Sequence, residues 1–334
     1  MPPAKKSLGV GLDIGTMNIV AARRGSNGLE YKRMRDVFLT LPVEQKKMLK
    51  LRQHSFVERE DEVIILGDQA LALANAFGND PRRPLSGGLI SPSESDALGV
   101  LKLLIQSVLG EPSEENEACY FSVPAPPLDQ PDRDIIYHTG VFERIVEECG
   151  FEAFASNEAM AIIFSECADD EFSGLSFSFG SGMTNVALSV NTVEVMSFSV
   201  AQGGDWIDKH AAQAVGMKQA RMCALKERGV NLMDPQSQEE EALALYYKAL
   251  IEKALTQVAA HFVAKSKDFQ LPAAIPIVVS GGTSKAEGFL ELFQKVWRKK
   301  KRKFPIEISE VRQAKDPLNA VAYGMLVQAM QEYE

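Results

Sequence analysis

Short apolar runs bounded by turn residues recur along the chain and predict buried strands. An apolar run at residues 8–14 is followed by a turn at residues 15–18 and by a second apolar run at residues 19–23, which predicts a hairpin with a glycine at its tip. The same order returns at residues 175–179 and 185–189, again around a glycine-containing turn. We therefore expect two copies of one strand–turn–strand unit.

Helical and strand patterns alternate between and after these units. Apolar residues at helical spacing predict helices over residues 93–109, 132–149, 158–167, 206–215, 218–228, 238–265, 289–296 and 319–331. Further strands are predicted at residues 63–66, 118–123, 194–200, 275–279 and 306–308. Strands followed by alternating helices and strands, twice over, indicate an α/β fold of duplicated architecture.

The length of the chain favours two lobes. A single core rarely exceeds ~250 to 300 residues, and this chain has 334. We expect a first lobe over residues 1–150, a second lobe over residues 151–318, and a C-terminal helix at about 319–334 that returns to the first lobe. The charged, irregular stretch at about 33–92 is interpreted as a small subdomain inserted in the first lobe.

Composition excludes several classes of protein. Hydrophobic residues make up 46% and charged residues 24%, which is typical of a globular protein and excludes disordered, collagen-like and disulfide-rich chains. No apolar stretch approaches the ~18 residues of a membrane-spanning helix. Residues 1–7 have no apolar segment behind their lysines, which argues against a secretory signal and predicts a cytoplasmic protein. The four cysteines and four histidines show no metal-ligand or nucleophile spacing.

One strongly basic segment stands out against the acidic total. It begins at Arg298, ends at Lys303 and consists of six consecutive cations, whereas the whole chain has 36 Lys and Arg against 45 Asp and Glu. The acidic remainder gives no strong nucleic-acid signal. The segment is interpreted either as a solvated loop or as a contact for an anionic membrane or an acidic partner, with Trp297 and Phe304 flanking it.

The two glycine-containing hairpins suggest a shared chemistry. Loops of this kind present backbone N–H groups to phosphate oxygens where side chains would block the approach. Asp13, at the end of the first strand, is suited to hold a hydrated Mg²⁺. Residues 280–283 (SGGT) follow another strand and would let a base or ribose lie against the backbone. Each loop alone is weak evidence, because a glycine after a strand is usually only a turn.

The order of the loops is more specific than any single loop. Six segments resemble, in chain order, the nucleotide-site segments of the actin, Hsp70 and sugar-kinase superfamily: residues 11–18 (GLDIGTMN), 157–161 (NEAMA), 177–185 (FSFGSGMTN), 203–208 (GGDWID), 278–283 (VVSGGT) and 316–324 (DPLNAVAYG). Residues 67–70 and 83–90 make the chain look most like the bacterial actin MreB and its magnetosome relative. The resemblance spans residues 8–331 and implies a duplicated two-lobe fold with a nucleotide cleft between the lobes.

The resemblance also implies ligands and site residues. It implies ATP or ADP with Mg²⁺, with Asp13 acting on the metal. The implied nucleotide contacts are Gly15, Thr16, Met17, Asn18, Gly180, Ser181, Gly182, Met183, Thr184, Gly203, Gly204, Asp205, Gly281, Gly282, Thr283 and Ser284. Glu158 falls where bacterial actins place the carboxylate that orients the attacking water. The alternative is that Glu158 is only a favourable charge at a helix N-terminus beside Asn157.

The chain departs from the family pattern in three places. Ser178 stands where the family has an aspartate, and Asn185 stands where acids are frequent. A neutral hydroxyl cannot replace the charge that helps to hold Mg²⁺, so slow or absent hydrolysis is expected. Only about ten residues separate Lys226 from the predicted helix at 238, so the second lobe is expected to have a reduced insertion at about 226–266.

Three functional hypotheses follow. The first is an actin-like, ATP-binding cytoskeletal protein that forms nucleotide-dependent filaments of itself and hydrolyses ATP slowly. The second is a non-polymerising, Hsp70-like or pseudo-ATPase module that acts as a nucleotide-gated latch for a partner. A small-molecule kinase of the same superfamily is weaker, because no substrate-side catalytic aspartate can be placed.

Overall fold

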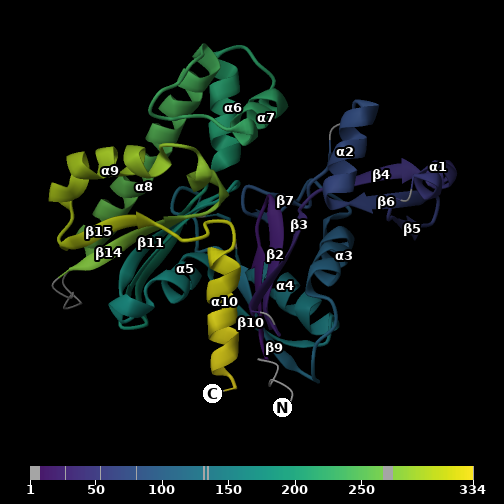
Figure 1. Ribbon diagram of the computed structural model, residues 1–334, viewed down its shortest axis with the longest axis horizontal. Helices are drawn as coiled ribbons and strands as arrows, with labels where there is room; N and C mark the ends of the chain where they lie inside the picture. The colour runs from purple at the N-terminus through teal and green to yellow at the C-terminus, as the bar shows by residue number, and fades with distance from the viewer. Residues whose placement is uncertain are drawn as a thin grey trace.

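The computed structural model describes residues 8–26, 28–52, 54–79, 81–130, 132–133, 135–265 and 274–333. Residues 1–7, on which the argument against a secretory signal rests, and Glu334, at the end of the predicted C-terminal helix, lie outside these ranges. The described chain forms two lobes, each built on a five-stranded sheet, with a small third body at one end of the long axis (Figure 1).

The two large sheets have the same topology. The first contains β1 (Val10–Ile14), β2 (Asn18–Gly25), β3 (Gly28–Arg35), β9 (Glu117–Val123) and β10 (Phe151–Asn157) in the order β10-β9-β1-β2-β3. The second contains β11 (Gly174–Phe179), β12 (Thr184–Val190), β13 (Val193–Val200), β14 (Ile275–Ser280) and β15 (Ile308–Gln313) in the order β13-β12-β11-β14-β15. In each sheet three antiparallel strands are followed by two parallel ones. The expected duplication is confirmed.

Helices cover both sheets. They are α3 (Ala97–Leu109), α4 (Ile136–Glu148), α5 (Glu158–Glu166), α6 (Gly204–Ala214), α7 (Gln219–Arg228), α8 (Gln238–Lys265), α9 (Phe289–Lys300) and α10 (Ala320–Gln331), with short 3-10 turns η2 (Ala168–Asp170), η3 (Gly282–Lys285) and η4 (Lys301–Lys303). The first lobe buries apolar faces of α3 and α4 against its sheet. The second buries faces of α6, α8 and α9. Among the described residues no helix is both long enough and apolar enough to cross a bilayer.

The segment between the third and ninth strands forms the inserted subdomain. It contains β4 (Phe38–Pro42), η1 (Val43–Gln45), α1 (Lys46–Leu51), β5 (Val57–Arg59), β6 (Glu62–Leu66) and α2 (Gly67–Phe77), with the three strands in the order β4-β6-β5. It has its own small core, which includes Leu39, Leu49 and Val63. The short hairpin of β7 (Leu85–Ser86) and β8 (Leu89–Ile90) then leads back to the first lobe.

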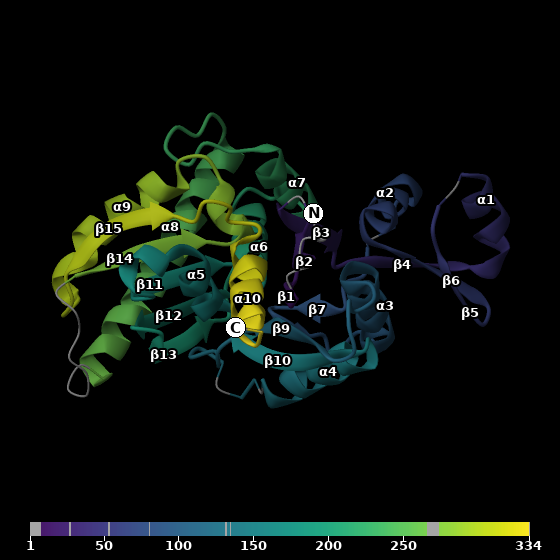
Figure 2. The ribbon, with the colours of Figure 1, turned by 60° about the horizontal axis from the view of Figure 1, so that its bottom comes forward.

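The C-terminal helix joins the two lobes. Helix α10 packs on β1 of the first lobe and on α5, as Figure 2 shows. A Cβ atom on Gly11 would lie 2.0 Å from the carbonyl oxygen of Ala322, and one on Gly324 would lie 1.8 Å from that of Ala161. Two glycines therefore allow α10 to approach both neighbours at backbone contact, which places the two sheets close to one helix.

Two strands that the pattern did not predict, and one whose bounds it misplaced, are edges of the large sheets. β3 and β10 form the two edges of the first sheet, and β15, which begins where the predicted strand at 306–308 ends, is an edge of the second. Edge strands expose one side and carry few apolar residues, so periodicity gives little signal. Because β10 pairs with β9, residues 151–157 lie in the first lobe rather than after its expected end at 150.

Two local predictions are also corrected. Helix α3 begins at Ala97 with Asp96 as its N-cap, and not at Ser93. The basic segment is not a loop, since it occupies the end of α9 and all of η4. Its aromatic neighbours are not available to a membrane, because Trp297 and Phe304 are each only 8% exposed and pack edge to face at 4.5 Å.

Candidate functional site

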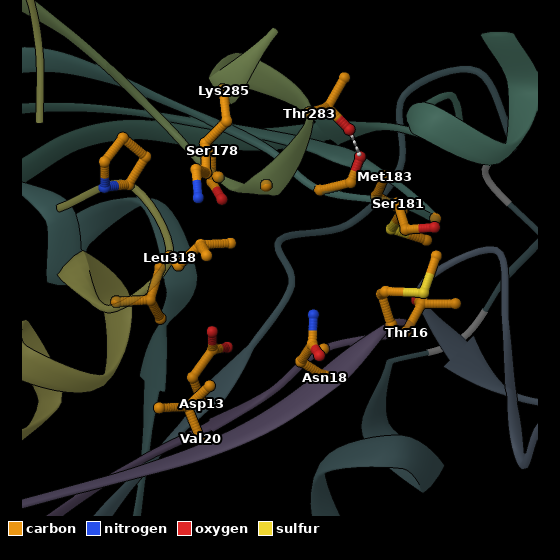
Figure 3. A pocket seen from close by; sticks show the side chains of 18 of the residues that line it. Asp13, Thr16, Asn18, Val20, Ser178, Ser181, Met183, Thr283, Lys285 and Leu318 are labelled. Carbon is orange, nitrogen blue, oxygen red and sulfur yellow. Dashed lines mark hydrogen bonds between the residues drawn. The ribbon is translucent and has the colours of Figure 1, made fainter. Parts of the chain in front are cut away.

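A cavity of about 590 Å³ lies between the lobes. It is lined by the turn after β1 and the turn after β11, which come from equivalent places in the two sheets. Figure 3 shows Asp13 and Asn18 directed into this space from the first lobe, with Ser178, Thr283 and Lys285 on the opposite side. Its volume lies within the ~300 to 1,000 Å³ typical of small-molecule sites.

The first turn, residues 13–18, is closed by a hydrogen bond from the Gly15 N–H to the Asn18 carbonyl at 3.0 Å. Asp13 is its first residue, and one carboxylate oxygen accepts a 2.9 Å hydrogen bond from the Ser122 hydroxyl on β9. Ser122 in turn accepts from the Ile14 N–H. The carboxylate is thus oriented by a neighbouring strand, and its other oxygen is left to face the cavity.

The second turn, residues 178–185, repeats this closure, with the Gly180 N–H donating to the Met183 carbonyl at 2.9 Å. Two other segments support it from behind. Thr283 donates to the Gly180 carbonyl at 2.9 Å, and the Asp205 N–H donates to the Ser181 carbonyl. The turn is thereby fixed between η3 and the start of α6.

The two turns lie in direct contact at their tips. A Cβ on Gly182 would lie 2.2 Å from the Gly88 nitrogen and 2.6 Å from the Thr16 hydroxyl oxygen. The Thr16 hydroxyl accepts a 3.1 Å hydrogen bond from the Gly88 N–H. Only glycine at position 182 permits this approach, so the turns of both lobes can contact one ligand.

Glu158 lies at the N-terminus of α5 and faces the cavity. Its helix is capped by Asn157, whose side-chain oxygen accepts from the N–H groups of Ala159 and Met160. The carboxylate accepts from the Ser178 hydroxyl at 2.6 Å and from the Asn185 amide at 2.8 Å. The two positions that depart from the family pattern therefore both hold Glu158.

The two carboxylates of the site are buried, which disfavours their ionised forms. Burial raises the pKa of Asp13 to about 6, although the Ser122 hydrogen bond and Arg33 oppose the shift. Burial, followed by the negative charge of Asp13, raises the pKa of Glu158 to about 8, and the Ser178 hydrogen bond opposes it. A cation placed between them would favour both ionised forms.

The chain's donors fit a phosphate ligand with a hydrated cation. Within the described residues, no group of three or more His, Cys, Asp or Glu side chains could hold a metal alone. Mg²⁺ needs no such group, since it keeps several waters and is bound by one or two carboxylates together with substrate phosphates. The described hydrogen bonds include none donated by the N–H groups of Thr16, Met17, Ser181 or Gly182, so these remain available to an anion.

Most of the predicted site residues line the cavity, and the rest lie behind it. Those that line it are Asp13, Gly15, Thr16, Met17, Asn18, Glu158, Gly180, Ser181, Gly182, Met183, Gly281, Gly282 and Thr283. Those that do not are Thr184, Gly203, Gly204, Asp205 and Ser284. Thr184 donates to the Gln202 carbonyl, and Ser284 donates to the Gly281 carbonyl. The second group therefore supports the turns.

Part of the cavity lining was not predicted from the sequence. Lys226, Glu227, Tyr247 and Lys285 from the second lobe line it, together with Leu318. Lys226 forms a 2.7 Å ion pair with the buried Asp208 and also donates to the Gly204 carbonyl. The only signal for this part was the resemblance of residues 316–318, since the other residues depend on how α7 and α8 pack.

The ion pairs that join the lobes include two beside the first turn. Arg35, at the end of β3, pairs with Glu227 on α7 at 3.1 Å, and Arg83 pairs with Asp205 on α6 at 3.4 Å. Both arginines also contact the sulfur of Met17 in the first turn. Opening of the cleft would have to break these contacts.

Comparison with known structures gives the fold a context. The described fold is similar to a structure described as "MamK double helical filament", with a TM-score of 0.71 and 19% identity over 96% of this chain and 98% of that chain. It is also similar to MreB 5 of Spiroplasma citri bound to AMPPNP, with a TM-score of 0.66 and 15% identity over 99% and 98% of the two chains. The protein EutJ from Carboxydothermus hydrogenoformans matches with a TM-score of 0.54 and 16% identity over 99% and 91%. These similarities establish the actin-like two-lobe fold.

Sequence comparisons give a family. Comparison with curated protein sequences yields no match. A protein-family model described as Volactin matches residues 8–329, which is almost the whole chain and includes both turns and helix α10. The chain therefore belongs to the Volactin family.

Proposed function

We propose that the cavity binds ATP with Mg²⁺ and that the chain assembles into nucleotide-dependent filaments while hydrolysing ATP slowly. One observation carries the proposal: two equivalent glycine turns, one from each lobe, meet at a cavity that also contains Asp13 and Glu158. Paired backbone turns suit a chain of phosphates, because N–H groups from both sides can contact it.

The residues of the site have separate roles in this proposal. Asp13 would hold the metal through its waters, and Ser122 would keep that carboxylate in place. The N–H groups of the two turns would bind the β- and γ-phosphates, and residues 281–283 with Lys226 and Glu227 would meet the nucleoside. When bound, Mg²⁺ would neutralise phosphate charge and orient the terminal phosphate.

Hydrolysis would depend on Glu158. Its carboxylate is fixed by Ser178 and Asn185 and can accept a proton from, or orient, a water near the terminal phosphate. Its raised pKa means that it is protonated near neutral pH until a cation approaches, so it becomes competent only with the metal in place. Ser178 adds no charge, and slow turnover is the expected consequence.

Self-assembly is supported by the fold and by what similar proteins do. The structures titled as MamK filaments are built from chains with this two-lobe shape. The Spiroplasma MreB 5 structures are titled as bound to AMPPNP and ADP. A head-to-tail contact between identical protomers gives a filament when the rotation between them does not close into a ring. The cytoplasmic location expected from the sequence stays a prediction.

Sedimentation with nucleotide tests the proposal. The wild-type chain, incubated with Mg²⁺ and ATP or a non-hydrolysable analogue, should pellet at high speed, and negative-stain microscopy should show filaments. Asp13→Ala should remain in the supernatant under the same conditions. A wild-type chain that stays monomeric with both nucleotides across a range of salt concentrations would contradict filament formation.

The latch hypothesis is the second candidate, and the cross-lobe ion pairs favour it specifically. Arg35–Glu227 and Arg83–Asp205 hold the lobes together beside the first turn, so a nucleotide that reorganises this turn could open or close the cleft. A monomer whose hydrodynamic radius changes with ATP, and which never pellets, would support this hypothesis over the first.

A further inference from the structure

The basic end of α9 carries six cations, and none of them is in an ion pair with a described residue. Here "basic end" means the last residues of α9 together with η4, residues 298–303. All of these residues except Lys300 are exposed, and Lys300 donates to the hydroxyl of Thr256 rather than to a carboxylate. Within the described part of the chain no ion pair involves residues 298–303. Six adjacent cations without counter-charges repel one another unless something anionic binds.

The opposite pattern occurs on the inserted subdomain. The end of β5, the turn after it and the first residue of β6, residues 58–62, are called here the acidic hairpin, and all of these residues are exposed. Glu60, Asp61 and Glu62 take part in no ion pair among the described residues. Its single cation, Arg59, is paired with Asp96 of the first lobe at 3.1 Å, which leaves the tip acidic.

The two surfaces cannot meet within one molecule. The basic end lies at one extreme of the long axis and the acidic hairpin at the other, and both views show this separation (Figures 1 and 2). Each surface can therefore be neutralised by the other only between two copies. One surface on each copy would meet a different surface on the next. Because the two surfaces lie at opposite ends of the long axis, such a contact can repeat from copy to copy into a filament.

Because each copy is negatively charged overall, two copies can associate only where a local attraction offsets their repulsion. The chain has a formal net charge of −9, so two copies repel at long range. Complementary patches overcome such repulsion locally and fix which surfaces meet. The basic end is the densest positive segment of the sequence, and the acidic hairpin is an exposed negative surface at the far end of the molecule.

A membrane fits the basic end less well than a second copy. Stable attachment to an anionic membrane normally combines cations with inserted apolar groups. Trp297 and Phe304 are buried, and the exposed large hydrophobic residues of the described chain include none between residues 289 and 308. The surface offers charge alone, as an acidic protein surface requires.

We propose that the basic end of α9 on one copy binds the acidic hairpin of the next copy. The inference rests on the proposed self-assembly and names the surfaces that would mediate it. It assigns the inserted subdomain as one pole of the protomer and the end of α9 as the other.

Charge reversal on each surface provides the main test. The first variant carries Lys301→Glu, Arg302→Glu and Lys303→Glu, and the second carries Glu60→Lys, Asp61→Lys and Glu62→Lys. Each alone should need a roughly tenfold higher concentration to pellet with Mg²⁺ and ATP, since exposed ion pairs are individually weak and three are reversed. An equimolar mixture should pellet like wild type, because each variant then presents the complement of the other. A control with Glu115→Lys, Glu143→Lys and Glu147→Lys, all exposed and outside both surfaces, should behave like wild type.

Chemical cross-linking separates this contact from filament formation. A carbodiimide joins only touching amine and carboxylate groups, and a mixture of nitrogen-14 and nitrogen-15 copies reveals links between molecules. The expected links join Lys299, Lys301 or Lys303 of one copy to Glu60, Asp61 or Glu62 of another. If these links form although the wild type makes no filaments, the contact stands and the proposed function fails.

Three results would overturn the contact. Filaments without these links would leave the proposed function standing and place the protomer contact elsewhere. Failure of the mixture to restore pelleting would show that charge complementarity is not the basis of the contact. Absence of the links together with pelleting on phosphatidylserine vesicles, lost on reversal of the basic end, would assign this surface to a membrane.

Discussion

The two turns of the cavity are closed by the same backbone hydrogen bond, but their side chains differ in charge. In each, a glycine N–H donates to the carbonyl three residues later, at 3.0 Å in the first turn and 2.9 Å in the second. Two residues before the glycine stands Asp13 in one turn and Ser178 in the other. The cross-strand neighbours of these residues are Val20 and Asn185. The first turn thus offers an acid and an apolar residue, and the second offers two neutral hydrogen-bonding groups.

Because of this difference, we expect the two lobes to have different functions in the site. In the second turn Ser178 and Asn185 both donate to Glu158, whereas in the first Val20 can make no such bond. The metal charge is therefore expected on the first lobe, and the orientation of the hydrolytic carboxylate on the second. A duplicated fold supplies the same loop twice, and side-chain chemistry then makes the copies unequal.

The largest effect is expected at Glu158. The Glu158→Gln substitution keeps the shape of the side chain but removes a proton acceptor, so single-turnover phosphate release should fall ~10² to 10⁴-fold. Binding of Mg²⁺ and ATP should change little, which separates the hydrolytic role from binding. Equal phosphate release by variant and wild type would remove Glu158 from the mechanism.

The next effect tests whether the turns are unequal in metal binding. Asp13→Ala should weaken binding of a fluorescent ATP analogue in Mg²⁺ by ~10 to 100-fold or more, the scale already seen when an outer partner of a metal ligand is lost. The matched change in the other turn, Ser178→Ala, should weaken it much less. Similar losses of nucleotide affinity in the two variants would contradict the proposal that the first turn alone binds the metal.

An aspartate at position 178, which the resemblance to the actin, Hsp70 and sugar-kinase superfamily implies there, gives a smaller change with two readouts. Ser178→Asp should raise turnover by up to about tenfold with Mg²⁺ present, because a second carboxylate can help to hold the metal and its waters. Without metal the same change should lower the melting temperature, since a carboxylate replaces the hydroxyl that donates to Glu158 at 2.6 Å. A variant that is unchanged in both respects would show that this hydroxyl is unimportant.

The smallest effect concerns the pH dependence of the ligand-free chain. The folded pKa of Glu158 is about 8, above its model-peptide value of 4.5, so the folded state binds more protons between these values. The stability contribution is therefore full below about pH 4.5 and is lost as pH rises through about 8. In EDTA, Glu158→Gln should raise the melting temperature at pH 8 by about 2 °C or more and leave it nearly unchanged at pH 5. An equal shift at both pH values would contradict the buried carboxylate pair.

Many of the helices and hairpins could be predicted from the sequence, because they depend on the local spacing of apolar and turn residues. The hairpins around Gly15 and Gly180, the long α8 and the C-terminal α10 all follow from apolar spacing and turn residues. The unpredicted strands β3 and β10, and β15, which the prediction overlapped only at Ile308, are edges, whose half-exposed residues lack alternation. Their positions depend on strand pairing, which a single sequence does not display.

The site was predictable only where glycine or a charged residue marks a turn. Asp13 and both turns were found in this way, whereas Glu158 was implied only by the resemblance to bacterial actins; all of them line the cavity. The roles of Ser178 and Asn185 as partners of Glu158 were not predicted, since they require α5 to lie against β11 and β12. The same holds for Arg35 and Glu227, which meet only because the lobes close on one another.

Calorimetric titration of the wild-type chain with ATP, with and without Mg²⁺, tests the central claim most directly. We expect saturable binding of one ATP per chain in Mg²⁺ and much weaker binding in EDTA, because phosphate charge and the Asp13–Glu158 pair would then face each other without a cation. Absence of any binding heat at millimolar ATP in Mg²⁺, or binding that is indifferent to the metal, would contradict it.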